Sequence, residues 1–366
     1  MNERTAEAAA GRPRYEVLDA LRGLCAVGVV ALHFCEAYGK PAWLPHSHLA
    51  VEYFLMLTGF TFIVAYDRRW ADGTLTVGGF LWRRFLRLWP LVLVGSFVGL
   101  VFTFILGPGM STVSKAISPD AVKDVGVFLY TLTLLPAPRS WGCLQPLQAQ
   151  TWTLFYIIWA NLAYGLLFRR LRTWMIAVGV ALGAAYSLYV VGHYHSYALG
   201  WNWEADHIVT ACGRVVFTVF AGMLIARKGW RLSFPGAGLV SALLAATVVF
   251  GPFCAEDRSV SFAVYEAVAV FAVLPLVILT GAGGRIPEGR FAAFCRFMGR
   301  YSFPLYATHF PVRIALGVWR RSAPADAPWT HHAALIFSAT VISLALAWLA
   351  MKAADAVGRL LGMHAR

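Results

Sequence analysis

The stretch LDALRGLCAVGVVALHFC, residues 18–35, decides how this chain folds. It is an apolar run long enough to cross a membrane as a helix, and yet it holds a guanidinium at Arg22 and an imidazole at His33. An α-helix turns about 100° and rises about 1.5 Å per residue. The two residues therefore share one face, within about 20°, with about 16 Å between them along the axis. The sequence predicts a site with a direction, in which a guanidinium lies near one membrane surface and an imidazole lies deep in the membrane.

The composition places this helix in a bilayer. Of the 366 residues, 59% are hydrophobic and only 13% are charged, whereas a soluble domain carries about 25% charged residues. Stretches of about 20 apolar residues can cross a hydrocarbon core of about 30 Å. We predict ten such spans, at 18–37, 48–66, 85–107, 150–168, 173–192, 206–226, 235–254, 262–281, 301–318 and 333–351. The expected fold class is an all-α polytopic membrane protein with about ten transmembrane helices.

An eleventh apolar run, Val125 to Leu135, is too short for a comfortable crossing and is followed by Pro136 and Pro138. We expect it to be a re-entrant or interfacial segment. Lys and Arg accumulate on the cytoplasmic side of membrane proteins. With ten spans and the N-terminus inside, the inner segments hold 21 of the 31 Lys and Arg residues and the outer segments hold seven. Both termini are therefore predicted to be cytoplasmic, with tails at 1–16 and 358–366 around a transmembrane domain at 17–357.

With Arg87, near the start of its span, counted among the inner basic residues, three basic residues remain within the predicted spans, namely Arg22, Arg214 and Arg313. The net charge of +13 thus mostly reflects basic residues in the predicted cytoplasmic segments. No basic helix or zinc-finger spacing indicates a nucleic-acid partner. The six cysteines form no CxxC pair, which argues against a zinc site or a disulfide framework, and we expect no metal. The polar first sixteen residues and the full-length first apolar run predict a retained membrane anchor rather than a cleaved signal peptide.

Five ordered elements of the sequence resemble the acyltransferase-3 family of integral-membrane acyltransferases. The first is the Arg22-x10-His33 pair, in which Asp19 and Gly23 complete an Asp-x-x-Arg-Gly context. The others are VEYFLMLTGF at 51–60, RRFLRLWP at 83–90, TWTL at 151–154 and YSFPLYATH at 301–309. The second element has Glu52 where the family usually has Asp. The likeness covers essentially the whole chain.

The resemblance implies a membrane-embedded O-acyltransferase. Such an enzyme moves an acyl group, commonly acetyl, from cytoplasmic acyl-CoA to a hydroxyl of a glycan, lipid or other acceptor. The expected partners are acyl-CoA, with acetyl-CoA as the expected donor, a hydroxyl acceptor such as a glycan or glycolipid, and membrane lipids. The expected location is a bacterial inner membrane.

Charge and depth suggest the role of each candidate residue. Because the donor is cytoplasmic and carries several phosphates, it is expected at the inner end of the first span. Arginine binds phosphate bidentately, and the candidates for this contact are Arg22, Arg83, Arg84, Arg87 and Arg214. Anionic lipid headgroups are the alternative partner of the cluster at 83–87, and a structural ion pair is the alternative for Arg214. His33 is expected to act as a general base, or alternatively as a nucleophile that forms an acyl-imidazole.

His309 is a second catalytic candidate, with a helix-packing hydrogen bond as the alternative. Asp19, Glu52 and Trp152 are expected to support the site. Ile157 stands where the family usually has a glutamate, five residues beyond the tryptophan of TWTL. This difference allows weakened catalysis, a different acceptor, or replacement of the carboxylate by Glu52.

Two other functions would also place His and Arg in spans. A polytopic transporter would show ligand-driven flux without acyl turnover, and a catalytically weakened relative would bind CoA without forming product. Near the outer loop 193–206, five residues mix aromatic rings with polar side chains, namely Trp201, Trp203, Glu204, Asp206 and His207. This mixture is typical of a carbohydrate site or of an interfacial aromatic belt.

Overall fold

The computed structural model describes residues 15–40, 43–106, 120–148, 150, 152–197, 200, 202–251, 259–324 and 326–360. These residues are mostly helical and form no strand; a single bridge pairs Cys143 with Asn202. The predicted all-α class is therefore confirmed.

The helices follow the apolar runs of the sequence. In chain order, the α-helices are α2 (Glu16–Ala37), α3 (Ala50–Ala71), α4 (Val77–Leu106), α5 (Ala121–Thr131), α6 (Trp152–Leu167), α7 (Thr173–Tyr194), α8 (Ala205–Lys228), α9 (Ala237–Val249), α10 (Val260–Val268), α11 (Leu274–Gly283), α12 (Arg290–Ser322) and α13 (Trp329–Leu360). The short elements are the 3₁₀ turns η2 (Ser47–Leu49), η4 (Arg139–Trp141) and η6 (Phe168–Arg170), and the π-helical turn η7 (Ala269–Val273), which joins α10 to α11.

Local sequence sets several of the helix ends. The side chain of Asp120 accepts hydrogen bonds from the first backbone N–H groups of α5, and Ser259 does the same for α10. Gly229 ends α8 with a φ of 64°, a left-handed conformation that glycine adopts without steric cost.

Seven helical segments of the described chain are long and apolar enough to cross a membrane. They are Glu16–Ala37, Ser47–Ala71, Val77–Leu106, Thr173–Tyr194, His207–Lys228, Val260–Gly283 and Trp329–Leu360. Helices also occupy the other three predicted positions, but α6 has only 16 residues, α9 has 13, and the 33 residues of α12 include many charged side chains. The chain is an integral membrane protein, and the count of ten spans stays a prediction.

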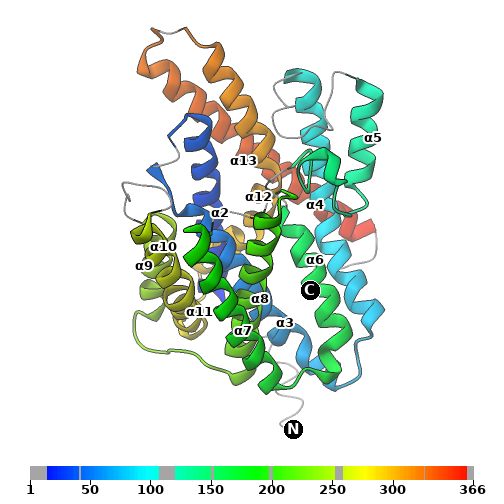
Figure 1. Ribbon diagram of the computed structural model, residues 1–366, viewed down its shortest axis with the longest axis vertical. Coiled ribbons are helices and arrows are strands. Elements are labelled where there is room, and N and C mark those ends of the chain that lie inside the picture. Colours follow the sequence, from blue (N-terminus) through cyan, green and yellow to red (C-terminus); the bar gives the residue numbers. More distant parts are fainter. Residues whose placement is uncertain are drawn as a thin grey trace.

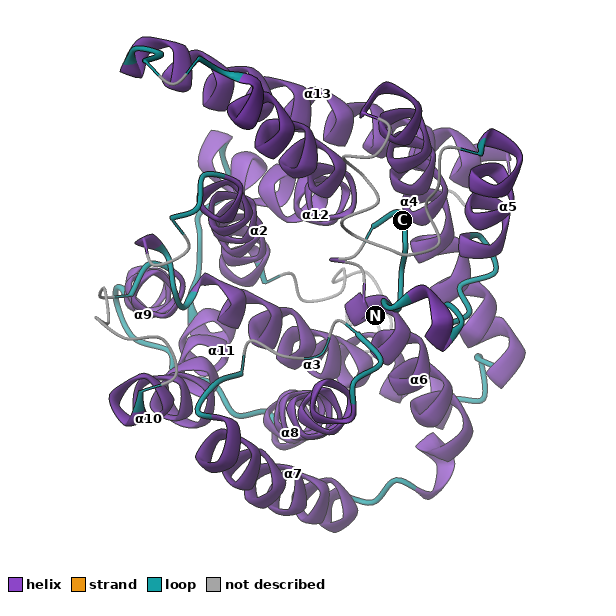
Figure 2. Ribbon diagram, turned by 45° about the horizontal axis from the view of Figure 1, so that its top comes forward, coloured by secondary structure: helices purple, strands orange, loops and turns teal. Residues whose placement is uncertain are grey.

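The segment predicted to be re-entrant or interfacial, Val125 to Leu135, overlaps the C-terminal part of α5. This helix has 11 residues, which is about 16 Å of length, and it packs beside the C-terminal part of α4 (Figure 1). Figure 2 shows α2 beside α12, which packs against α13, and α3 beside α8, which packs against α7. Helix α9 lies beside α11, and α4, α5 and α6 are on the remaining side. The largest apolar core lies where α2, α3, α8, α9 and α11 meet.

One helix pair positions the site described below. Contacts between α2 and α12 run in the same order along both helices, from Arg22 with Gly299, through His33 with His309, to Glu36 with Arg313. The two helices are therefore parallel. They approach closely where Gly299 meets Asp19, since a Cβ added to Gly299 would lie 2.6 Å from the Cβ of Asp19.

Candidate functional site

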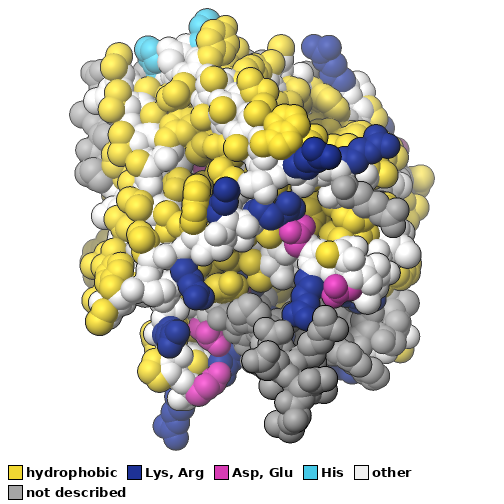
Figure 3. All heavy atoms as spheres, turned by 90° about the horizontal axis from the view of Figure 1, so that it is seen from below, with side chains coloured by type: hydrophobic (Ala, Val, Ile, Leu, Met, Phe, Trp, Pro, Cys, Tyr) yellow, Lys and Arg dark blue, Asp and Glu magenta, His cyan; other side chains and the backbone are white. Residues whose placement is uncertain are grey.

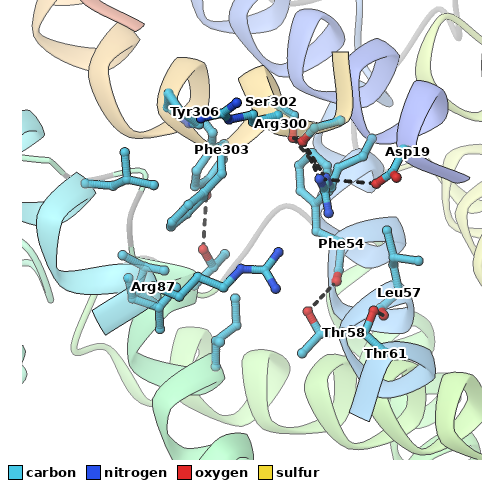
Figure 4. Close-up of a pocket in the computed structure, with 18 of the residues that line it drawn as sticks. Asp19, Phe54, Leu57, Thr58, Thr61, Arg87, Arg300, Ser302, Phe303 and Tyr306 are labelled. Carbon is cyan, nitrogen blue, oxygen red and sulfur yellow. Dashed lines mark hydrogen bonds and ion pairs between the residues drawn. The ribbon is translucent and has the colours of Figure 1, made fainter. Parts of the chain in front are cut away.

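A cavity of about 680 Å³ lies between α2, α3, α4, α6, α12 and α13 (Figure 4). Much of its wall is apolar, with Phe54 on α3, Leu88 on α4, Ile157 on α6 and Phe303 on α12. Its charged lining among the described residues consists of the arginines Arg22, Arg84, Arg87, Arg296 and Arg300 and the aspartates Asp19 and Asp355. The cavity thus combines a cationic part with an apolar part.

Arg22 is held at the cavity wall by α12. Its Nε donates to the backbone oxygen of Gly299 at 2.9 Å and to Oγ of Ser302 at 3.0 Å, and its Nη2 lies 3.3 Å from Oδ1 of Asp19. Nη2 also donates to the Gly299 oxygen. Asp19, which is expected to support the site, thus contacts Arg22 directly. These contacts fix the guanidinium, whose side chain is still 25% exposed toward the cavity.

The arginine cluster at 83–87 divides into two parts. Arg84 and Arg87 line the cavity, whereas Arg83 is exposed and does not line it. The Nε of Arg84 donates to Oδ1 of Asn161 at 2.5 Å, which anchors a buried guanidinium to α6. The side chain of Arg87 extends into the cavity in Figure 4. The structure therefore brings two of these three arginines together with Arg22.

Sequence reasoning missed two further cavity arginines, Arg296 and Arg300. They precede the predicted span 301–318, but α12 begins at Arg290 and carries both on one face, four residues apart. Arg296 lies 3.2 Å from Glu288, and Arg300 pairs with Asp355 of α13. Extending the helix of the predicted span 301–318 backwards would have placed both beside Ser302. Lys and Arg side chains are spread over the face of the molecule that Figure 3 shows.

The two histidines singled out from the sequence are direct neighbours. Nδ1 of His33 lies 2.9 Å from Nε2 of His309, with ring centroids 5.0 Å apart. His309 is fully buried, and its Nδ1 lies 3.1 Å from the backbone oxygen of Leu305 and 3.0 Å from that of Tyr306.

These contacts assign the proton positions of the neutral pair. Carbonyl oxygens only accept hydrogen bonds, so Nδ1 of His309 carries a proton. Nε2 of His309 then has a free lone pair, which accepts the Nδ1–H of His33. The remaining nitrogen of His33, Nε2, is unprotonated and able to accept a proton. The arrangement is that of a base oriented by a second group.

Tyr306 stands between the cavity and the histidines. It lines the cavity, its ring centroid is 6.0 Å from that of His309, and its hydroxyl lies 3.1 Å from Oγ1 of Thr153. The same hydroxyl donates to the backbone oxygen of Gln150. Neither His33 nor His309 lines the cavity. The His pair therefore begins one helical turn beyond the cavity wall that Tyr306 forms.

Arg214 is placed differently from the other candidate arginines. It is buried, its Nε donates to Oε1 of Glu52 at 2.6 Å, and its guanidinium lies 5.2 Å from the ring centroid of Trp152. It does not line the cavity. The structure thus forms the ion pair that was the alternative for Arg214. Oε1 of Glu52 is engaged by this pair, while Ile157 leaves an apolar surface in the cavity wall.

The outer-loop residues serve local contacts. Nε1 of Trp203 donates to the backbone oxygen of Ala137 at 2.8 Å, and Nδ1 of His207 accepts from the backbone N–H of Gly200 at 2.9 Å. Trp201 and the side chain of Asp206 lie outside the described residues. Within the described part of the chain, no group of three or more His, Cys, Asp or Glu side chains could hold a metal ion.

Comparison with known proteins identifies the family of the chain. A family model described as "Acyltransferase domain" matches residues 15–350. A relative named "Protein 2 in picA locus" from Rhizobium radiobacter is 34% identical over 161 residues, which cover 41% of this chain and 81% of that protein. No solved structure matches the chain. The chain belongs to the acyltransferase-3 family and is a membrane acyltransferase.

Proposed function

We propose that this enzyme transfers an acyl group, acetyl in the first instance, from cytoplasmic acyl-CoA to a hydroxyl of a glycan, lipid or other acceptor. The observation that carries the proposal is the order of groups along the parallel helices α2 and α12. The arginine-lined cavity comes first, at Arg22, and the His33–His309 pair follows at the next level. This order suits a phosphate-bearing donor that enters from one side and a base that receives the acceptor from the other.

The cavity fits the two chemical halves of such a donor. Its arginines offer charge-assisted hydrogen bonds to phosphate oxygens. Its apolar walls, which include Phe54, Ile157 and Phe303, offer a path for the pantetheine arm. The thioester would then reach the end of the cavity at Tyr306, next to His309. Ile157 keeps this path free of a competing carboxylate.

The unprotonated Nε2 of His33 supplies the base for the transfer. It takes the proton of the acceptor hydroxyl while the hydroxyl oxygen attacks the carbonyl carbon of the thioester. A C–O bond forms, the carbonyl oxygen becomes an oxyanion, and the C–S bond breaks as the carbonyl re-forms. The leaving sulfur takes the proton from Nε2. The products are an O-acyl ester, free CoA thiol and a neutral His33.

His309 is a positioning residue in this scheme. Its Nε2 holds the Nδ1–H of His33, so that the lone pair of His33 stays on Nε2, and it shares the positive charge that develops on His33 during proton transfer. The carbonyl oxygens of Leu305 and Tyr306 fix the orientation of His309 in turn. The role resembles that of the orienting group in other nucleophile and base pairs.

The proposed orientation keeps both termini in the cytoplasm and has ten spans in a bacterial inner membrane. The inward concentration of Lys and Arg supports it. It places the inner ends of α2 and α12, with Arg22, Arg296 and Arg300, on the side where acyl-CoA is made. The acceptor then approaches from the outer side.

Purified protein in detergent, supplied with acetyl-CoA labelled in the acetyl group and with candidate alcohols, tests the proposal. We expect labelled ester and an equal amount of free CoA thiol. A stoichiometric burst of thiol without an acceptor would favour the acyl-imidazole route over the general-base route. Protein in vesicles that drives ligand flux while acetyl-CoA stays intact would contradict the proposal and favour a transporter.

A further inference from the structure

An ion pair lies on the outer side of the two histidines, on the same two helices. Glu36 follows His33 by three residues on α2, and Arg313 follows His309 by four residues on α12. One helical turn is 3.6 residues, so both lie one turn further outward. Nη2 of Arg313 is 3.3 Å from Oε2 of Glu36. The parallel helices therefore present the His pair and this ion pair at successive levels.

The hydrogen-bonding groups of Glu36 and Arg313 are only partly used by this ion pair. Arg313 gives Glu36 a single long contact rather than the two parallel hydrogen bonds that guanidinium and carboxylate groups form at their best. Its Nε is buried and has no hydrogen-bond partner among the described residues. A buried N–H without a partner is costly and calls for an explanation, such as a ligand that supplies the missing oxygen. Both side chains are nevertheless partly exposed, 29% for Arg313 and 34% for Glu36, so a ligand reaches the pair from its exposed side, and the guanidinium must rotate for the buried Nε–H to meet it.

The groups around the pair connect it to the reaction site. The guanidinium of Arg313 lies 5.3 Å from the ring centroid of Phe310, and that ring meets His33 edge-on at 5.4 Å. Tyr38 and Arg320, which form a cation–π contact at 5.5 Å, lie at the outer ends of the same helices.

We propose that Glu36 and Arg313 form the acceptor subsite and that this subsite selects a compound with two neighbouring hydroxyls. The inference rests on the proposed function, because it needs His33 to be the base. One hydroxyl of the ligand gives its proton to Nε2 of His33. The neighbouring hydroxyl donates to the carboxylate of Glu36 and accepts the unpaired Nε–H of Arg313.

This arrangement matches the hydrogen-bonding capacity of a hydroxyl group, which donates once and accepts. The carboxylate only accepts and the guanidinium only donates, so together they satisfy one neighbouring hydroxyl completely. The pair has no net charge, and it therefore gives no electrostatic preference for an anionic or a cationic ligand. A single alcohol would reach His33 but would leave the Nε–H of Arg313 unpaired, which disfavours its binding.

Matched probes test the inference. Purified protein with saturating acetyl-CoA is given trans-cyclohexane-1,2-diol, cyclohexanol or methyl glucoside, and ester formation is followed at several concentrations. We expect the diol and the glucoside to have KM values at least about tenfold below that of cyclohexanol, as expected for one hydrogen bond to a charged group. Glu36→Gln and Arg313→Gln should raise the KM for the diol about tenfold and leave the KM for cyclohexanol and for acetyl-CoA unchanged.

The control is Arg321→Gln, an exposed arginine on the same helix, which should change no KM. Arg313→Lys keeps the charge but loses the Nε–H, so it should resemble Arg313→Gln for the diol. Equal KM values for the diol and cyclohexanol in the wild type would overturn the subsite while the proposed function stands. Equal effects of Glu36→Gln on the KM values of all three alcohols would also overturn the subsite. Absence of ester with every alcohol, with acetyl-CoA left intact, would instead overturn the proposed function.

Discussion

Nδ1 of His33 lies 2.9 Å from Nε2 of His309, although 276 residues separate them in the sequence. The contact joins the first and the ninth of the predicted spans, and it exists because α2 and α12 are parallel. Since the second nitrogen of His309 is engaged by two carbonyl oxygens, the contact fixes which nitrogen of His33 is basic. The chemistry assigned to His33 therefore depends on a residue at the other end of the chain.

His309→Ala should lower kcat about a hundredfold and leave the affinity for CoA unchanged, because it removes the group that orients the base but no cavity residue. Acetyl transfer and calorimetry with CoA measure the two effects separately. His331→Ala, an exposed histidine on α13, is the matched control and should behave as the wild type. A His309→Ala enzyme within a few-fold of wild-type kcat would show that His309 only packs the helix.

Arg22 should bind the phosphates of the donor. Arg22→Lys keeps the charge but loses the bidentate geometry and should weaken CoA binding about tenfold, and Arg22→Ala should weaken it more. The affinity for the acceptor should not change. Arg83→Ala is the control, since Arg83 does not line the cavity and its loss should leave CoA affinity intact. Unchanged CoA affinity in Arg22→Ala, together with a lowered thermal stability, would make Arg22 a structural anchor of α2.

Substitutions of Arg300 and of Asp355 should change the affinity for CoA in opposite directions. Arg300 lines the cavity but is paired with Asp355, which lines it too. Arg300→Gln should weaken CoA binding, and Asp355→Asn should strengthen it, because the partner that neutralises Arg300 is removed. Calorimetry at two salt concentrations measures both, and higher salt should reduce the difference. Two changes of the same sign would mean that the ion pair acts only through the structure of α12 and α13.

The close contact of α2 and α12 predicts an effect on stability. A methyl group at Gly299 would overlap Asp19, so Gly299→Ala should lower the free energy of unfolding by about 1–3 kcal/mol and displace the guanidinium of Arg22. Gly126→Ala, on α5, meets no atom within 4 Å and serves as the control. Thermal unfolding in detergent compares the two variants. Equal stability of both variants would show that α2 and α12 separate easily at this level.

Topology is open to direct measurement. With ten spans, the basic residues around Arg170 lie in the cytoplasm, whereas a full crossing by residues 125–135 would place them outside. A reporter fused at about residue 170, or labelling of a cysteine introduced there, distinguishes the two cases. An outside position at this point would reverse every later loop of the proposed topology.

The sequence alone predicted what depends on local periodicity. The apolar runs predicted the helices, and the spacing of Arg22 and His33 placed both on one face of α2. Long-range pairing was not predictable in this way. Nothing local shows that His309 meets His33 or that Gly299 receives Arg22, because both contacts follow from the packing of distant helices. The same limit explains why Arg83 was grouped with Arg84, although only the latter turns toward the cavity.

The surroundings of Arg214, Arg296 and Arg300 differ from those predicted, for other physical reasons. Arg214 was a candidate for phosphate, but a buried guanidinium requires a counter-charge, and Glu52 supplies it. Arg296 and Arg300 lie outside the predicted span because charge lowers the apparent hydropathy of the segment before Tyr301. In the structure, α12 simply continues through them.

The central claim is that His33 is the base that acts on the acceptor hydroxyl while the donor occupies the arginine-lined cavity. Transfer of labelled acetyl from acetyl-CoA by purified His33→Gln protein, measured together with its affinity for CoA, tests this claim most directly. Gln keeps a polar side chain in the membrane but cannot accept a proton at neutral pH. We predict that acetyl transfer falls at least about a hundredfold and that CoA affinity stays at the wild-type value. Transfer within a few-fold of the wild type, with CoA still bound, would contradict the account.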